Sequence, residues 1–151
     1  HTRYISVTGV QTCALPIYYA RTMGPERAER MDACGTALSI GVPFAIHCDA
    51  PVTPIGPLFT AWCAVNRLTA SGRTLGEAEK ISVADALRAI TLGAAYTLKL
   101  DEELGSIDVG KRADFAVLEQ DPLADVTPDK LRDVKVWGTV LGGRIFEAPK
   151  Q

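Results

Sequence analysis

The sequence has few of the residues from which metal centres and disulfide scaffolds are built. Its 151 residues include two histidines, His1 and His47, so this chain alone cannot assemble a multi-histidine metal centre. The four cysteines contain no C-x-x-C pair and are too sparse for a disulfide scaffold. Free thiols are typical of a reducing compartment, so we expect a cytoplasmic protein.

Basic surplus and long apolar runs are absent as well. The formal net charge is -2, which argues against binding nucleic acid or an anionic membrane surface. No run approaches the roughly 18 apolar residues of a membrane span. The length fits one domain, and the 47% hydrophobic content suffices for a packed core. We therefore expect a globular protein whose partner is a small molecule.

The opening segment, residues 1–17, resembles translated sequencing adapter. It shows no amphipathic period, helix cap or signal-peptide order. Residues 7–17 can be back-translated without a mismatch into a common short-read library adapter, and residues 1–3 into the adjoining primer. We expect this segment to be an assembly artefact, so that His1 and Cys13 carry no function and the rest is a fragment of a longer protein. The alternative is a genuine strand around residues 4–10.

The first half of the remaining chain follows an α/β pattern. Pro25 at a first helical position and Gly41 at the end predict a helix over 25–40, in which Gly35 costs roughly 1 kcal/mol unless another element packs closely there. The apolar run 42–48 is typical of a strand covered on both faces in a parallel sheet. The proline-rich stretch 49–58 must then be a loop.

The second half changes from a helical to a strand period. Residues 58–68 predict a helix, and Ser82 with Asp85 predicts the N-cap of a longer one, whose apolar stripe runs from Val83 to Leu98. Short strands are expected at 113–118, 134–141 and 144–147, the last two joined by a Gly142-Gly143 hairpin turn. This order indicates the end of an α/β domain followed by a small β unit.

Asp49 is the residue whose position points most directly to chemistry. It follows the predicted buried strand at its carboxyl end, where α/β sheets and barrels place their active sites. Its ordinary alternative is to cap the following loop. His47 lies on the same strand face, roughly 6.5 to 7 Å away, and is either a ligand or a hydrogen-bonded core residue. Cys48 should point to the opposite face, and Trp62 and Tyr96 are most simply core or interdomain packing.

Two segments resemble the metal-dependent amidohydrolase superfamily. Residues 46–52, IHCDAPV, resemble the D-A-P-V motif of its N-substituted formamide deformylase-like branch. A second stretch resembles the superfamily's C-terminal signature, T-x-x-A-A followed by G-S-I-x-x-G-K-x-A-D, at Thr91, Ala94, Ala95, Gly105, Ser106, Ile107, Gly110, Lys111, Ala113 and Asp114.

The resemblance implies the fold and the domains. It implies an α/β chain that is the C-terminal fragment of a (β/α)8 TIM barrel, residues 18–104, followed by part of a small β-sandwich domain, residues 105–151. On that template the strand 42–48 is the eighth barrel strand.

The resemblance also implies the chemistry. Asp49 is then a ligand of a divalent metal, most simply zinc, and the general base that takes the proton from the attacking water. The parent protein would hydrolyse carbon-nitrogen bonds other than peptide bonds in a small amide-like or formamide-like substrate. The superfamily's other metal ligands have no counterparts here, so we expect this fragment to be inactive. A ring-amidine deaminase and a non-catalytic α+β interaction module stay open as alternatives.

Overall fold

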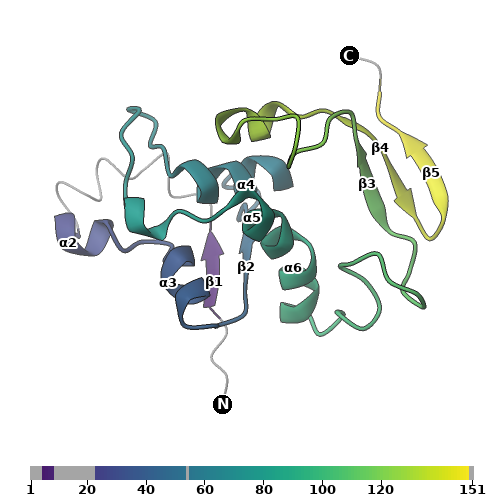
Figure 1. Ribbon diagram of the computed structural model, residues 1–151, viewed down its shortest axis with the longest axis horizontal. Coiled ribbons are helices and arrows are strands. Elements are labelled where there is room, and N and C mark those ends of the chain that lie inside the picture. Colours follow the sequence, from purple (N-terminus) through teal and green to yellow (C-terminus); the bar gives the residue numbers. More distant parts are fainter. Residues whose placement is uncertain (1–4, 9–22, 54, 150–151) are drawn as a thin grey trace.

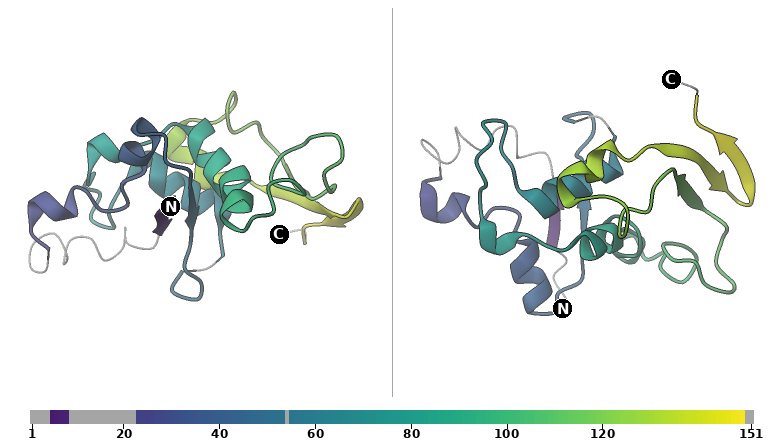
Figure 2. Two further views of the ribbon diagram at one scale, coloured as in Figure 1. Left: turned by 90° about the horizontal axis from the view of Figure 1, so that it is seen from below. Right: turned by 45° about the horizontal axis from the view of Figure 1, so that its top comes forward.

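The computed structural model describes residues 5–8, 23–53 and 55–149. Helices surround a two-stranded parallel sheet at one end, and a three-stranded antiparallel sheet lies at the other end, away from α2 (Figure 1, Figure 2). Among the described residues, no helix is long and apolar enough to cross a membrane. The elements are β1 (Ile5–Thr8), α2 (Pro25–Ala28), α3 (Cys34–Ser39), β2 (Phe44–His47), α4 (Pro57–Asn66), η3 (Glu77–Glu79), α5 (Val83–Ile90), α6 (Leu92–Thr97), β3 (Phe115–Leu118), η4 (Pro128–Asp133), β4 (Val136–Leu141) and β5 (Arg144–Glu147).

Strand β2 is the centre of the larger core. Phe44, Ala45 and Ile46 are all buried, and because successive side chains point to opposite faces, both faces of the strand are covered. Helices α4, α5 and α6 pack against it. The predicted strand over 42–48 is therefore confirmed in its central part, and the predicted loop follows it directly.

Strand β1 lies within the segment 1–17 and pairs in parallel with β2, with Ile5 opposite Phe44 and Thr8 opposite His47. A strand here agrees with the alternative of an extended segment around residues 4–10. Parallel pairing uses main-chain groups that every extended segment carries, so it requires no particular side chain from β1. The adapter origin stays a prediction, and His1 and Cys13 lie outside the described residues.

The helix predicted over 25–40 was wrong in its middle, where the chain turns between α2 and α3. Asp32 has a left-handed backbone with φ of 51°. The Arg67 guanidinium donates to the carbonyl oxygens of Met31 and Asp32, at 2.6 and 3.0 Å, and so takes both out of a helical ladder. A partner 36 positions away has overridden the local helical pattern.

Gly35 confirms the expectation of a close approach inside the predicted helix. A Cβ built on it would lie 2.5 Å from the carbonyl oxygen of Ala78, which is in η3. The absence of a side chain therefore lets α3 and η3 touch through their main chains. This contact explains a glycine that the helix propensity alone disfavours.

The long helix predicted from Ser82 is two helices. Its start is confirmed, since the Ser82 hydroxyl accepts the Asp85 N–H at 3.1 Å. The prediction was wrong beyond Thr91, where φ and ψ of -115° and -91° end α5 before α6 begins. At Gly93 a Cβ would stand 2.4 Å from the Phe44 carbonyl oxygen, so the break seats the start of α6 directly on β2.

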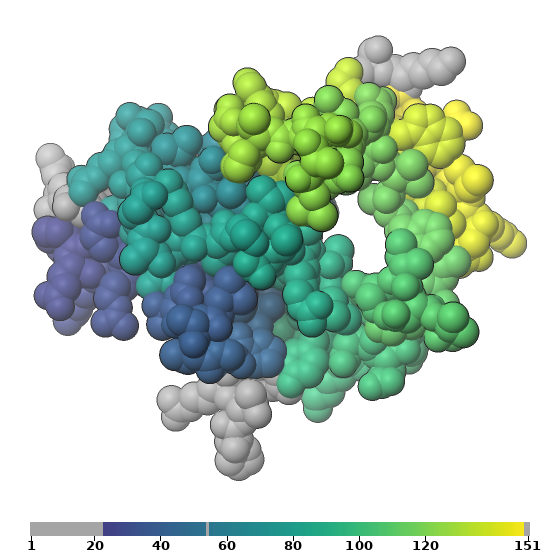
Figure 3. Space-filling view, viewed as in Figure 1, coloured from purple at the N-terminus to yellow at the C-terminus, as the bar shows by residue number. Residues whose placement is uncertain are grey.

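The C-terminal strands form the antiparallel sheet β3-β4-β5. Gly142 and Gly143 have φ of 55° and 80°, as a two-residue hairpin turn of type I′ requires, which confirms the predicted turn. The sheet leaves many large apolar side chains in water: Phe115, Val117, Val136, Trp137, Leu141, Ile145 and Phe146. Figure 3 shows an open gap between this sheet and the helical part.

Trp62 of α4 contacts η4, the segment that precedes β4. Its indole N–H donates to the Asp129 carbonyl at 2.8 Å, and the Arg132 guanidinium lies 4.3 Å from the ring centroid. Asn66, one turn on, donates to the Pro128 carbonyl at 2.8 Å. Trp62 is also buried in the larger core, so the expectation that it is a packing residue, in the core or between domains, is confirmed for the core.

The two halves of the C-terminal signature pack on each other. Gly105 has φ of 92°, and a Cβ on it would lie 2.6 Å from the Cβ of Ala95 and 3.0 Å from the Cα of Leu92. The T-x-x-A-A helix and the G-S-I turn thus need small residues at their contact. Lys111 completes the turn, donating to the Ser106 hydroxyl at 2.7 Å and to the Asp101 carbonyl.

Candidate functional site

Asp49 stands at the carboxyl end of β2, two residues after the strand ends. Its side chain is exposed, and its backbone is left-handed with φ of 52°. Within the described part of the chain, no hydrogen bond or ion pair engages the Asp49 carboxylate. The carboxylate is therefore available to a partner, and the interpretation of Asp49 as a loop cap through its side chain has no bond to support it.

A small hydrogen-bonded turn holds the main chain on both sides of Asp49. The Asp49 N–H donates to Nδ1 of His47 at 3.1 Å, and the Asp49 carbonyl accepts the Val52 N–H at 2.9 Å. The Thr53 hydroxyl donates to the Cys48 carbonyl at 2.5 Å. The main chain of the D-A-P-V segment is thus held by local hydrogen bonds, whereas the Asp49 carboxylate has no hydrogen-bond partner among the residues that the structure describes.

His47 and Cys48 differ in exposure at the end of β2. The His47 side chain is exposed, and its imidazole accepts the Asp49 backbone N–H. The prediction that the His47 and Asp49 side chains share one face assumed an extended chain through Asp49, whereas β2 ends at His47 and Asp49 has a left-handed backbone. Cys48 is partly buried with a free thiol. The expectation that His47 is a core residue was wrong, since the strand's burial ends at Ile46.

The described residues bring no group of three His, Cys, Asp or Glu side chains together in a geometry that could hold a metal ion. At the carboxyl end of β2, Asp49 offers carboxylate oxygens, which zinc and other divalent cations accept as ligands. One carboxylate fits part of a divalent metal site, and further ligands would have to come from outside these residues.

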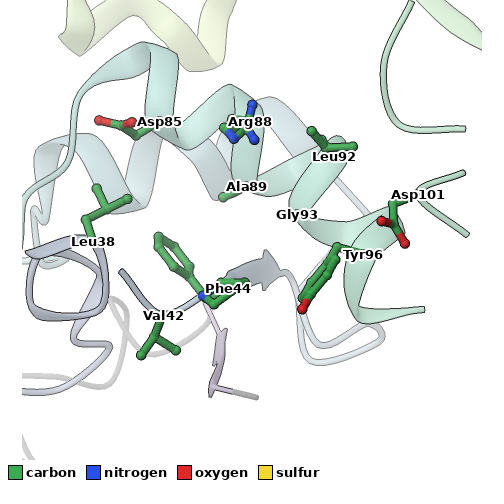
Figure 4. A pocket seen from close by; sticks show the side chains of 11 residues that line it. Leu38, Val42, Phe44, Asp85, Arg88, Ala89, Leu92, Gly93, Tyr96 and Asp101 are labelled. Atoms are coloured by element: carbon green, nitrogen blue, oxygen red, sulfur yellow. The ribbon is translucent and has the colours of Figure 1, made fainter. Parts of the chain in front are cut away.

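A pocket of about 350 Å³ lies at the other end of β2. Figure 4 shows its wall formed by Val42 and Phe44 at the start of the strand, with Arg88 from α5 and Tyr96 from α6. It does not include Asp49. Parallel strands carry chemistry at their carboxyl ends, so we place the candidate site at Asp49 and not in this pocket.

The sequence analysis did not identify Arg67 and Glu79 as buried charges, because no local sequence pattern distinguishes them from exposed ones. Arg67 and Glu79 are each 5% exposed. Arg67 donates to three main-chain carbonyls, those of Met31, Asp32 and Leu75. The charged groups of Arg67 and Glu79 both have hydrogen-bond partners, so we interpret these two residues as structural.

Glu79 and Cys34 lie in the same buried region as Arg67. The Glu79 carboxylate accepts the Thr36 N–H at 2.7 Å and the Thr36 hydroxyl at 2.5 Å, which ties η3 to α3. Burial raises the pKa of the Cys34 thiol to about 12, which favours the protonated sulfur at neutral pH.

Comparison with known proteins points to one family. A profile of the amidohydrolase family matches residues 5–146. The N-substituted formamide deformylase of Arthrobacter pascens is 35% identical over 106 residues, which cover 70% of this chain and 19% of that protein. Imidazolonepropionase of Micrococcus luteus is 49% identical over 39 residues, which cover 26% of this chain and 10% of that protein.

Solved structures agree on the fold. A metal-dependent hydrolase from Pyrococcus horikoshii superposes with a TM-score of 0.66 at 23% identity, over 84% of this chain and 26% of that chain. The chain thus spans 19% of the deformylase and 26% of this hydrolase. The profile match and the deformylase both fit the resemblance found in the D-A-P-V and G-S-I segments. The chain belongs to the amidohydrolase family.

Proposed function

We propose that the parent protein is a metal-dependent hydrolase of carbon-nitrogen bonds other than peptide bonds, with Asp49 as a metal ligand and general base. The observation that carries this is a carboxylate without a partner among the described residues, at the carboxyl end of a strand buried on both faces. The deformylase similarity favours an amide-like or formamide-like substrate.

The remaining metal ligands belong, in this proposal, to strands outside the described residues. A (β/α)8 barrel takes about 250 residues, and β2 with its helices supplies one strand of it. Residues 105–151 are then part of the small β-sandwich domain. Zinc is the ion we favour, because a catalytic zinc site combines histidine and carboxylate ligands.

The role of Asp49 follows from ordinary acid-base chemistry. A divalent metal held in part by Asp49 would supply a water of lowered pKa near neutral pH. The Asp49 carboxylate would accept a proton from the attacking water and return it to the departing nitrogen, which would leave as a neutral amine. An aspartate held by its main chain, with free carboxylate oxygens, suits both tasks.

The test uses the full-length protein recovered by extending the reading frame upstream. With zinc, it should release formate from an N-substituted formamide, and Asp49→Asn should lower kcat by at least ~100-fold and reduce bound zinc. Glu102→Gln, an exposed acid outside the D-A-P-V segment, is the matched control and should change neither. Full activity in Asp49→Asn would refute the proposal.

A second candidate is a ring-amidine deaminase, which would hydrolyse the exocyclic carbon-nitrogen bond of a cyclic amidine and release ammonia. The similarity to imidazolonepropionase, a name that denotes a nitrogen heterocycle, favours a cyclic substrate. Assaying cyclic amidines for ammonia release beside the formamide separates the two. A full-length protein that binds no zinc and turns over neither substrate would favour the interaction module.

The 151-residue chain by itself should be inactive, because it supplies one ligand of the proposed site.

We also propose that residues 1–17 derive from sequencing adapter. Sequencing the source DNA across this junction tests that origin directly. An identical residue 1–17 segment in an adapter-free clone would refute it.

A further inference from the structure

The hydrogen bond between the Asp49 N–H and the His47 imidazole gives the histidine a role that the family assignment leaves open. The bond is 3.1 Å long and joins residues two positions apart, at the point where the chain leaves β2. The acceptor is Nδ1, and an imidazole nitrogen that accepts a hydrogen bond carries no proton and no metal. The lone pair of Nδ1 is therefore already in use.

Hydrogen bonds on both sides hold the backbone of Asp49. Its φ of 52° is a left-handed conformation, which aspartate adopts more readily than most residues with a Cβ but still at some cost in free energy. The Val52 N–H holds its carbonyl from one side, and the imidazole holds its N–H from the other. The direction in which the carboxylate leaves the chain follows from this backbone conformation.

We propose that His47 is a positioning residue that fixes the left-handed backbone of Asp49 and so aims its carboxylate, and that it does not bind metal through Nδ1. This inference rests on the proposed function for its consequence in catalysis, but the hydrogen bond itself can be tested without activity. The carboxyl end of β2 then contributes one ligand, Asp49, and its support, His47.

The first measurement is amide hydrogen exchange at Asp49 in the printed chain, without metal. His47→Asn keeps an acceptor, since Oδ1 of asparagine occupies the place of Nδ1 on Cγ, whereas His47→Leu has none. We expect exchange at Asp49 to be roughly two- to tenfold faster in His47→Leu and close to wild type in His47→Asn. The Ala45 amide, inside β2, is the internal reference for an intact fold.

The second measurement is on the full-length zinc-loaded protein. Turnover and bound zinc should both fall in His47→Leu, because the Asp49 ligand is no longer held in position, and both should be restored in His47→Asn. Loss of zinc in both variants would show that His47 is a ligand and overturn the inference, as would unchanged Asp49 exchange in His47→Leu. If Asp49→Asn keeps full activity while the exchange results stand, the proposed function fails and the positioning role survives.

Discussion

Replacing Asp32 with asparagine should stabilise the chain at neutral pH. Burial raises the pKa of the Asp32 carboxyl from 3.8 to about 6, against the opposing charge of Arg67. The folded state thus prefers the neutral carboxyl. Asparagine is uncharged and tolerates the left-handed φ of 51° at this position, so Asp32→Asn removes the charge without disturbing the turn.

The sign and size follow from proton linkage. Between pH 3.8 and about 6 the folded state holds a proton that the unfolded state has lost, so the free energy of unfolding falls as the pH rises through this window. At about 1.4 kcal/mol for each factor of ten in proton affinity, the upper limit is about 3 kcal/mol. Because the side chain is only partly buried, we expect screening to reduce this to about 1–2 kcal/mol.

The assay is urea unfolding followed by tryptophan fluorescence at pH 4, 5, 6 and 7.5. The advantage of Asp32→Asn over wild type should be near zero at the lowest pH and reach its full value at the highest. Glu102→Gln, an exposed acid, is the control and should show no such trend. An advantage for Asp32→Asn that is the same at every pH would refute the reasoning.

Two further predictions compare matched residues in the same urea assay. Gly105→Ala should cost about 2–4 kcal/mol, because its Cβ would overlap α6, whereas Gly110→Ala, with the same φ of 92° and open space around it, should cost only the backbone term of about 1 kcal/mol. Equal losses would contradict the packing role of the signature glycine. Trp62→Phe removes a hydrogen bond and the Arg132 contact and should lower the free energy of unfolding by about 1–2 kcal/mol. Trp137→Phe, at an exposed position, should lower it by less than about 0.5 kcal/mol. A similar loss for both variants would show that the α4–η4 contact contributes little.

The features that were predictable are those encoded locally. The Ser82 cap, the Gly142-Gly143 turn and the buried strand before Asp49 each depend on neighbouring residues. The breaks at Asp32 and Thr91 depend instead on contacts from distant segments: the Arg67 guanidinium in one case and the Phe44 main chain in the other. The spacing of apolar residues along a helix contains no information about such distant contacts, so the sequence did not predict either helix break.

The candidate site divides in the same way. The position of Asp49 at a strand end follows from the order of apolar, polar and proline residues around it. Its left-handed backbone and the imidazole that holds its N–H are three-dimensional details without a sequence pattern of their own. The η4 turn under Trp62 was also missed, because its residues contact α4 across 67 positions.

The apolar side chains on the β3-β4-β5 sheet have a practical consequence for every measurement described above. Aromatic and aliphatic groups in contact with water drive molecules together as the protein concentration rises. Sedimentation velocity over a range of concentrations should therefore come before any comparison of variants. A mild detergent or an attached solubility tag would keep the protein monomeric, so that each unfolding transition reports on single molecules.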